Sequence, residues 1–228
     1  MKRSAQALAT AVLVLATTTT YATLHSRASG SMVYDDDLNI TWLADANFAK
    51  SSGYSSTGKM SWDIAVGWAS TLEFGGYSDW RLPSTLVPDY ACTSQAWWSY
   101  SAYNCSGSEI GHLFYIELGG NRDQKISDSG DPDLSLFTNL QDIYWSETDL
   151  SATGLITGPN SAYVFETFIG FQMPTSKEAQ WYAWAVRDGD ITSSIPEPPT
   201  IGLIFLAALL ITVGNRALPP TSCAPHQI

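Results

Sequence analysis

The sequence predicts an α+β fold for one domain that lies between two terminal sorting segments. Two observations predict this class. Apolar residues recur at helical spacing in two early segments, and apolar and polar residues alternate in later ones, as in antiparallel strands. The loops between these segments are long, which in a compact domain usually indicates function or binding. Nine Trp and eleven Tyr supply ample material for a packed core.

The first elements are two short strands and a helix. Residues 33–43 fit two strands around the turn Asp35-Asp36-Asp37, because Asp side chains form local hydrogen bonds in turns. Ser61 can cap a helix that begins at Trp62 and stops before Gly75-Gly76. Its apolar face comprises Trp62, Ala65, Val66, Ala69 and Leu72.

The second helix and the later strands follow the same reasoning. Ser108 can cap a helix that ends at Gly119-Gly120, and its apolar face comprises Ile110, Leu113, Phe114 and Leu118. Residues 143–146 fit a strand, residues 163–172 alternate as one half-buried strand, and residues 180–187 fit a final strand. The turn Asp188-Gly189-Asp190 then leaves the domain.

The N-terminal residues 1–28 have the pattern of a secretory signal peptide. Lys2 and Arg3 precede an apolar stretch that is too short for an ordinary spanning helix. Small residues then offer several cleavage sites, after Ala16, Ala22 or Ala28. We therefore expect export across the inner membrane, cleavage by signal peptidase, and a mature domain over residues 29–194.

The C-terminal residues 195–228 form a second sorting segment. They contain an apolar helix expected over residues 199–214, which is short for a hydrocarbon core of about 30 Å. Arg216 follows this helix and would stay on the cytoplasmic side. The segment predicts transient membrane anchoring.

The charge of the domain excludes one class of partner. Residues 29–195 hold seven Lys and Arg against twenty-one Asp and Glu, a net charge of −14. Binding to nucleic acid requires clustered cations that neutralise phosphates, so no nucleic-acid partner is expected. An acidic surface favours solubility and binding of divalent cations.

Two cysteines lie within the domain. An exported protein meets an oxidising compartment, so Cys92 and Cys105 are expected to form a disulfide, which would stabilise the fold by about 3 kcal/mol. A redox or metal-binding pair is the alternative. The spacing lacks a Cys-x-x-Cys pattern, and His112 is the nearest histidine.

Two segments are candidates for ligand binding. Aromatic rings stack on sugars, so Trp97, Trp98, Tyr100 and Tyr103 in the disulfide loop are candidates for glycan binding; the alternative is that one Trp is buried and the other covers the core. Calcium prefers six to eight oxygen ligands. Asp128, Asp131 and Asp133 could supply several of them, unless they form an ordinary solvent-exposed turn, and the same ambiguity applies to residues 35–37.

No catalytic residues can be assigned from the sequence. His112 is the single histidine of the expected domain, and a lone histidine on a helix is more often structural than catalytic. A glycosidase requires two carboxylates at a suitable separation, but nothing in the sequence selects a pair among twenty-one. A carboxylate-based hydrolase therefore remains an alternative.

The C-terminal segment resembles the PEP-CTERM sorting signal. The motif Pro196-Glu197-Pro198 precedes the hydrophobic helix, and Arg216 stands for the basic end. The resemblance implies recognition by an exosortase in a Gram-negative bacterium that makes extracellular polysaccharide. The pattern departs from the signal in its single basic residue and in the extension to Ile228. A plain membrane anchor is the alternative.

The domain resembles the Lcl C-terminal domain family. Six segments match in order, of which Asp79-Trp80-Arg81-Leu82-Pro83 is the most specific; they are residues 38–47, 58–62, 75–83, 107–115, 144–146 and 183–187. The resemblance implies a C-type-lectin-like fold, shared with formylglycine-generating enzymes, and binding to extracellular polysaccharides. Those enzymes use cysteines in an arrangement that this chain does not reproduce, so their activity is not expected.

The most specific motif has a structural interpretation. Arg81 is one of few cations among many acids and is expected to pair with Asp79 or with a carboxylate of a late strand. Trp80 and Leu82 would fill the core, and Pro83 would fix the chain direction. We therefore interpret Asp79, Trp80, Arg81 and Pro83 as residues that hold the fold together.

These observations together predict a noncatalytic module that binds polysaccharide at the cell surface or in the extracellular matrix, with calcium as the one cofactor considered. A structural matrix protein without a defined ligand is the alternative, together with the hydrolase.

Overall fold

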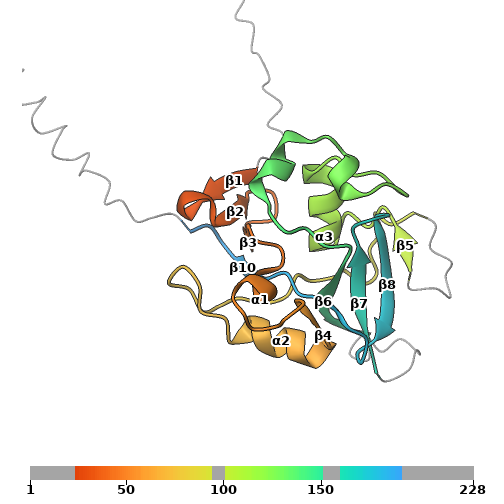
Figure 1. Ribbon diagram of the computed structural model, residues 1–228. Coiled ribbons are helices and arrows are strands. Elements are labelled where there is room, and N and C mark those ends of the chain that lie inside the picture. Colours follow the sequence, from red (N-terminus) through yellow and green to blue (C-terminus); the bar gives the residue numbers. More distant parts are fainter. Residues whose placement is uncertain (1–23, 94–100, 151–159, 192–228) are drawn as a thin grey trace, which may run out of the picture. The chain divides into compact units, whose positions relative to one another are not determined.

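The computed structural model describes residues 24–93, 101–150 and 160–191, which form an α+β fold of two sheets and few short helices (Figure 1). This confirms the predicted fold class. The α-helices are α1 (Phe48–Ser51), α2 (Trp62–Ser70) and α3 (Glu109–His112). A π turn over Leu113–Glu117 continues α3, and single 3-10 turns lie at Ala28–Gly30, Ile126–Asp128 and Pro132–Leu136. No helix among the described residues is long and apolar enough to cross a membrane.

The first sheet has four antiparallel strands in the order β1-β2-β3-β10. Its strands are β1 (Leu24–Arg27), β2 (Met32–Asp35), β3 (Ile40–Leu43) and β10 (Val186–Asp188). The predicted pair of strands around an Asp-rich turn is confirmed by β2 and β3. Strand β1 lies inside the range assigned to the signal peptide, so the folded unit begins before residue 29. An ion pair joins its last residue, Arg27, to Asp190 at 2.8 Å.

The second sheet has six strands in the order β4-β9-β6-β7-β8-β5. All neighbours are antiparallel except β6 and β9, which are parallel. Its strands are β4 (Lys59–Met60), β5 (Ala102–Tyr103), β6 (Ile143–Asp149), β7 (Ser161–Glu166), β8 (Phe171–Ser176) and β9 (Trp181–Tyr182).

Two predicted strands are interrupted in the structure. The single strand expected over residues 163–172 is a hairpin, in which β7 and β8 flank a turn closed by a hydrogen bond from Gly170 N to Glu166 O of 2.8 Å. Gly170 has φ 71°, which glycine adopts without steric cost. The final strand expected over residues 180–187 is divided between β9 and β10, because Ala183–Ala185 cross from one sheet to the other.

Both predicted helices are present. The second predicted helix corresponds to α3 and the π turn, and its expected apolar face is buried, with Ile110, Leu113, Phe114 and Leu118 each at most 3% exposed. Only its first turn is α-helical, and the π turn follows. Ser61 and Ser108 occupy the N-cap positions, but neither side chain forms the capping hydrogen bond. The hydroxyl of Ser108 instead accepts a hydrogen bond from Leu86 N at 3.1 Å.

The core between the two sheets is aromatic. The rings of Trp42 and Trp184 have centroids 4.9 Å apart, and Tyr144 lies 5.2 Å from Trp184. The indole N–H of Trp184 donates to Leu43 O at 2.7 Å, which ties the crossing segment to β3. The rings of Phe114 and Phe165 have centroids 5.5 Å apart, so the π turn that follows α3 is fixed against the six-stranded sheet.

Candidate functional site

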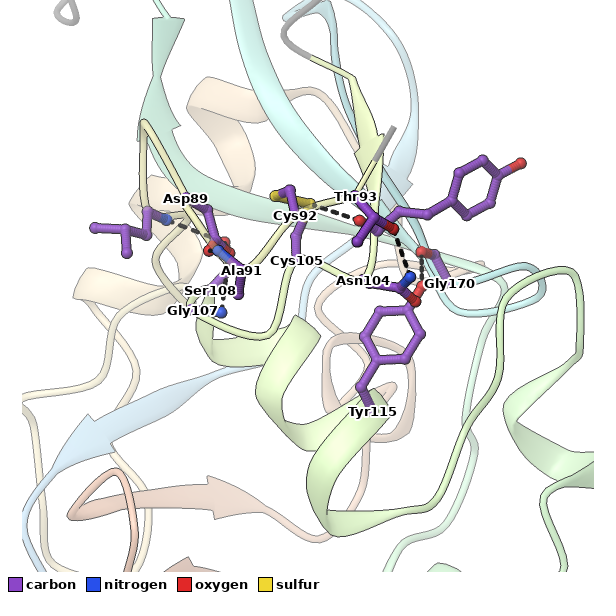
Figure 2. Close-up of a disulfide and its surroundings, with 12 residues drawn as sticks. Asp89, Ala91, Cys92, Thr93, Asn104, Cys105, Gly107, Ser108, Tyr115 and Gly170 are labelled. Carbon is purple, nitrogen blue, oxygen red and sulfur yellow. Dashed lines mark hydrogen bonds between the residues drawn. A yellow bond between two sulfur atoms is a disulfide. The ribbon is translucent and has the colours of Figure 1, made fainter. Parts of the chain in front are cut away.

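The two cysteines of the long loop form the predicted disulfide (Figure 2). The Cα atoms of Cys92 and Cys105 lie 4.1 Å apart. Beside the disulfide, Thr93 N donates to Tyr103 O at 2.8 Å and Tyr103 N donates to Thr93 O at 3.3 Å. The chain therefore leaves and rejoins the described fold close to one β-bridge. Of the predicted glycan-binding residues, Trp97, Trp98 and Tyr100 lie outside the described residues, and Tyr103 lies at this bridge.

Tyr103 belongs to a small aromatic patch that also comprises Phe171 and Arg122. The rings of Tyr103 and Phe171, which pair across β5 and β8, have centroids 4.6 Å apart. The guanidinium of Arg122 lies 4.0 Å from the centroid of the Tyr103 ring. Tyr103 and Phe171 are half-buried and Arg122 is exposed, so the patch combines apolar ring surface with hydrogen-bond donors.

The base of the disulfide loop is held by a buried carboxylate. Asp89 is 3% exposed and accepts hydrogen bonds from Ala91 N and Gly107 N, each at 2.9 Å (Figure 2). The oxygens of Asp89 also lie near the two cysteine sulfurs. Those sulfurs are joined in the disulfide and cannot act as thiolate ligands, so this group holds the loop and does not form a metal site.

The acidic segment proposed for calcium uses its carboxylates locally. Asp131 Oδ1 accepts a hydrogen bond from Asp133 N at 2.9 Å, and Ser127 Oγ lies 3.0 Å from Asp128 Oδ1. Within the described part of the chain, Asp128, Asp131 and Asp133 do not form a group with three ligand atoms within 4.8 Å. Calcium binding at this segment stays a prediction.

The motif Asp79-Trp80-Arg81-Leu82-Pro83 connects α3 to β10. Arg81 forms two hydrogen bonds with Glu109, of 2.7 and 2.8 Å, and two with Asp188 Oδ1, of 2.6 and 3.3 Å. The expected partner in a late strand is therefore present in β10. The other expected partner, Asp79, instead pairs with Arg187 at 2.9 Å.

The remaining residues of the motif pack as expected from their types. Trp80 and Leu82 are 2% and 1% exposed. The carbonyl of Pro83 accepts a hydrogen bond from Glu147 N at 2.9 Å, which connects the motif to β6. Burial alone would lower the pKa of Arg81, but the hydrogen bonds and charges of Glu109 and Asp188 outweigh it and raise that pKa.

A second cluster of ionisable groups lies where α3 and the π turn meet the turn between β2 and β3. One ligand atom each from Asp35, His112 and Glu117 lies within 4.8 Å of the others. His112 Nε2 is 3.2 Å from Glu117 Oε1 and 3.6 Å from Asp37 Oδ2. The side chains of Glu117 and His112 are 2% and 13% exposed, and Asp35 is fully buried.

The π turn explains how Glu117 and His112 meet. In an α-helix of about 3.6 residues per turn, a residue five positions further on points to a different side. A π turn has hydrogen bonds between residues five apart, and such turns are frequent at functional sites. Leu118 N donates to Leu113 O at 2.9 Å in this pattern, and Glu117 lies over His112.

Burial and neighbouring charges shift the pKa values of Asp35 and His112. Burial raises the pKa of Asp35 to about 6, and the nearby charge of Glu117 adds to this effect. Burial alone would lower the pKa of His112, but the hydrogen bond to Glu117 and the charges of Asp35 and Asp37 outweigh it and raise that pKa.

Sequence reasoning did not identify this cluster. It treated His112 as a lone structural residue and residues 35–37 as either a turn or calcium ligands, and it gave Glu117 no role. The spacing of five residues between His112 and Glu117 carries no signal for an ordinary helix, and the approach of Asp35 depends on tertiary packing. The sorting residues Pro196, Glu197, Pro198 and Arg216 lie outside the described residues.

Comparison with family models, with curated proteins and with solved structures found no match to this chain.

Proposed function

We propose that this chain is an exported protein whose folded unit is a noncatalytic binding module for extracellular polysaccharide. The observation that carries the proposal is the aromatic patch of Tyr103, Phe171 and Arg122 beside the disulfide loop. Sugar rings present apolar C–H faces that stack on aromatic rings, and their hydroxyls accept hydrogen bonds from a guanidinium. A half-buried pair of rings that already pack against each other provides such a surface without a large cost in side-chain entropy.

Two further observations support export and the class of glycan. The Cys92–Cys105 disulfide fits an oxidising compartment outside the cytoplasm. The strongly acidic composition disfavours anionic polysaccharides, because long-range repulsion would slow their approach and weaken binding. We therefore expect neutral polysaccharides as ligands. The N-terminal signal, the exosortase-type tail and delivery to the cell surface or matrix belong to this proposal.

The test is binding of the purified protein to a panel of neutral and anionic polysaccharides immobilised on a surface. Saturable binding to a neutral glycan that is lost in Tyr103→Ala and Phe171→Ala is the expected result. Tyr54→Ala is the matched control, because Tyr54 is 56% exposed and its ring lies beside that of Trp68, far along the chain from the patch. Absence of binding by the folded protein would contradict the proposal and favour a structural matrix protein or a hydrolase.

A further inference from the structure

The cluster of Asp35, His112 and Glu117 holds more negative charge than its protein surroundings compensate. Asp35 is fully buried and Glu117 nearly so, and both lie beside a single imidazole. Asp37 adds a third carboxylate, 3.6 Å from His112 Nε2. Lys and Arg form no ion pair with these three acids among the described residues. A buried group of this kind needs a cation or a proton to be stable.

One oxygen of Asp35 shows that the cluster is incomplete. Asp35 Oδ1 accepts a hydrogen bond from Leu38 N at 3.0 Å, whereas Oδ2 is buried and has no hydrogen-bond partner in the described structure. The indole N–H of Trp42 interacts with Asp35 and lowers its pKa, but no hydrogen bond of normal geometry joins them, so this contact satisfies the carboxylate only in part. A buried carboxylate oxygen without a donor is costly, and a bound cation would satisfy it.

The distances in the cluster fit ligands of one metal ion. Two ligands that each lie about 2.1 Å from a tetrahedral ion are about 3.4 Å apart. His112 Nε2 lies 3.2 Å from Glu117 Oε1, close to that value, and one ligand atom of Asp35 lies within 4.8 Å of both. Asp37 Oδ2 lies 3.6 Å from His112 Nε2 but outside this group of three. The half-exposed side chain of Asp37 marks the side from which an ion can enter.

The donor set indicates the class of metal. Calcium and magnesium take oxygen ligands, whereas an imidazole nitrogen together with carboxylates suits zinc and related first-row ions. We propose that Asp35, His112 and Glu117 bind one divalent first-row transition-metal ion, for which Zn²⁺ is the probe, while Asp37 adds negative charge at the solvent side of the site. This site is separate from the aromatic patch and does not depend on the proposed glycan binding.

A bound ion would connect the end of β2 to α3 and the π turn. Asp35 is the last residue of β2 and Asp37 lies in the turn that follows. His112 ends α3, and Glu117 is the last residue of the π turn. The four-stranded sheet and the helical segment of α3 and the π turn would then both supply ligands to the same ion. Because binding to the folded state alone stabilises it, Zn²⁺ is expected to raise the unfolding temperature.

The test is a titration of the chelator-treated, full-length protein with Zn²⁺ by isothermal calorimetry, with Ca²⁺ titrated in parallel. One Zn²⁺ per chain, a raised unfolding temperature and much weaker Ca²⁺ binding are expected. The variants Asp35→Asn, His112→Gln and Glu117→Gln should each weaken Zn²⁺ binding by more than the roughly tenfold that loss of an outer-shell partner costs. Asp36→Asn is the matched control, because it removes the same charge from the same turn at an exposed position.

The results that would overturn the proposal are equally specific. Absence of stoichiometric Zn²⁺ binding to the wild-type protein would overturn it. Equal weakening in Asp36→Asn would assign the binding to general attraction by acidic residues, and unchanged affinity in His112→Gln would exclude the imidazole ligand. Substitution with Co²⁺ in the wild-type protein gives a readout that needs no variant, because Co²⁺ in a four- or five-coordinate protein site absorbs visible light far more strongly than octahedral aqueous Co²⁺. A spectrum identical to that of aqueous Co²⁺ would contradict the site.

Discussion

Replacement of Arg81 by Met tests how the motif around Arg81 holds the fold together. Met keeps most of the apolar stem of the side chain and removes its charge, so the loss of packing is small. Glu109 would keep its hydrogen bond from Ser84 N of 2.7 Å, but its carboxylate would remain 14% exposed without a cation. Loss of one partner from a buried ion pair costs about 3–5 kcal/mol. Because Arg81 is 25% exposed, we expect a loss of about 2–4 kcal/mol in the free energy of unfolding.

The assay is urea denaturation at pH 7, followed by circular dichroism and linear extrapolation. Two matched variants separate the contributions. Asp188→Asn should cost less than about 1 kcal/mol, because the side chain of Asp188 is 78% exposed. The double variant Arg81→Met with Glu109→Gln should be more stable than Arg81→Met alone, because the uncompensated charge is removed. A loss below about 1 kcal/mol for Arg81→Met, or no recovery in the double variant, would refute the reasoning.

Three further predictions concern single features of the fold. In the presence of a chelator, Asp35→Asn should be about 1–3 kcal/mol more stable than the wild type at pH 7 and equally stable below pH 4. The pKa of Asp35 in the folded protein is raised from 3.8 to about 6, so the wild type loses stability as the pH rises through that interval. Urea denaturation at both pH values checks this, and a loss of stability at pH 7 would contradict it. Gly111→Ala should lose at least about 2 kcal/mol, because its Cβ would lie 1.9 Å from Cys105 O, whereas Gly67→Ala, where no atom lies within 4 Å, should gain up to about 1 kcal/mol by the same measurement. Replacement of Cys92 and Cys105 by Ser should lower the free energy of unfolding by about 3 kcal/mol, and dithiothreitol should have the same effect on the wild type only.

The parts of the fold that depend on local pattern were predictable from the sequence. Strands β2 and β3 and both longer helical segments follow from apolar spacing and from turn residues that act over a few positions. The hairpin of β7 and β8 was missed because the alternation between successive residues that indicates a strand continues without interruption through its turn. Gly170 was the available signal, since an isolated glycine within an alternating segment indicates a bend.

The ionic contacts were predictable only in part. The many acids made an ion pair for Arg81 an obvious expectation, but the choice of Glu109 and Asp188 over Asp79 is fixed by where α3 and β10 pack. The cluster around His112 was beyond reach for a related reason. Asp35 lies more than seventy positions before His112 in the sequence, and Glu117 is positioned by a π turn, for which apolar spacing gives no pattern.

The ion pair between Arg27 and Asp190 has a consequence for how such a unit can be recombined. It places the first strand and the last turn of the described fold within one hydrogen bond of each other, at 2.8 Å. A unit whose ends meet can be inserted into a surface loop of another protein, or have its ends joined and be reopened elsewhere, without long connecting peptides.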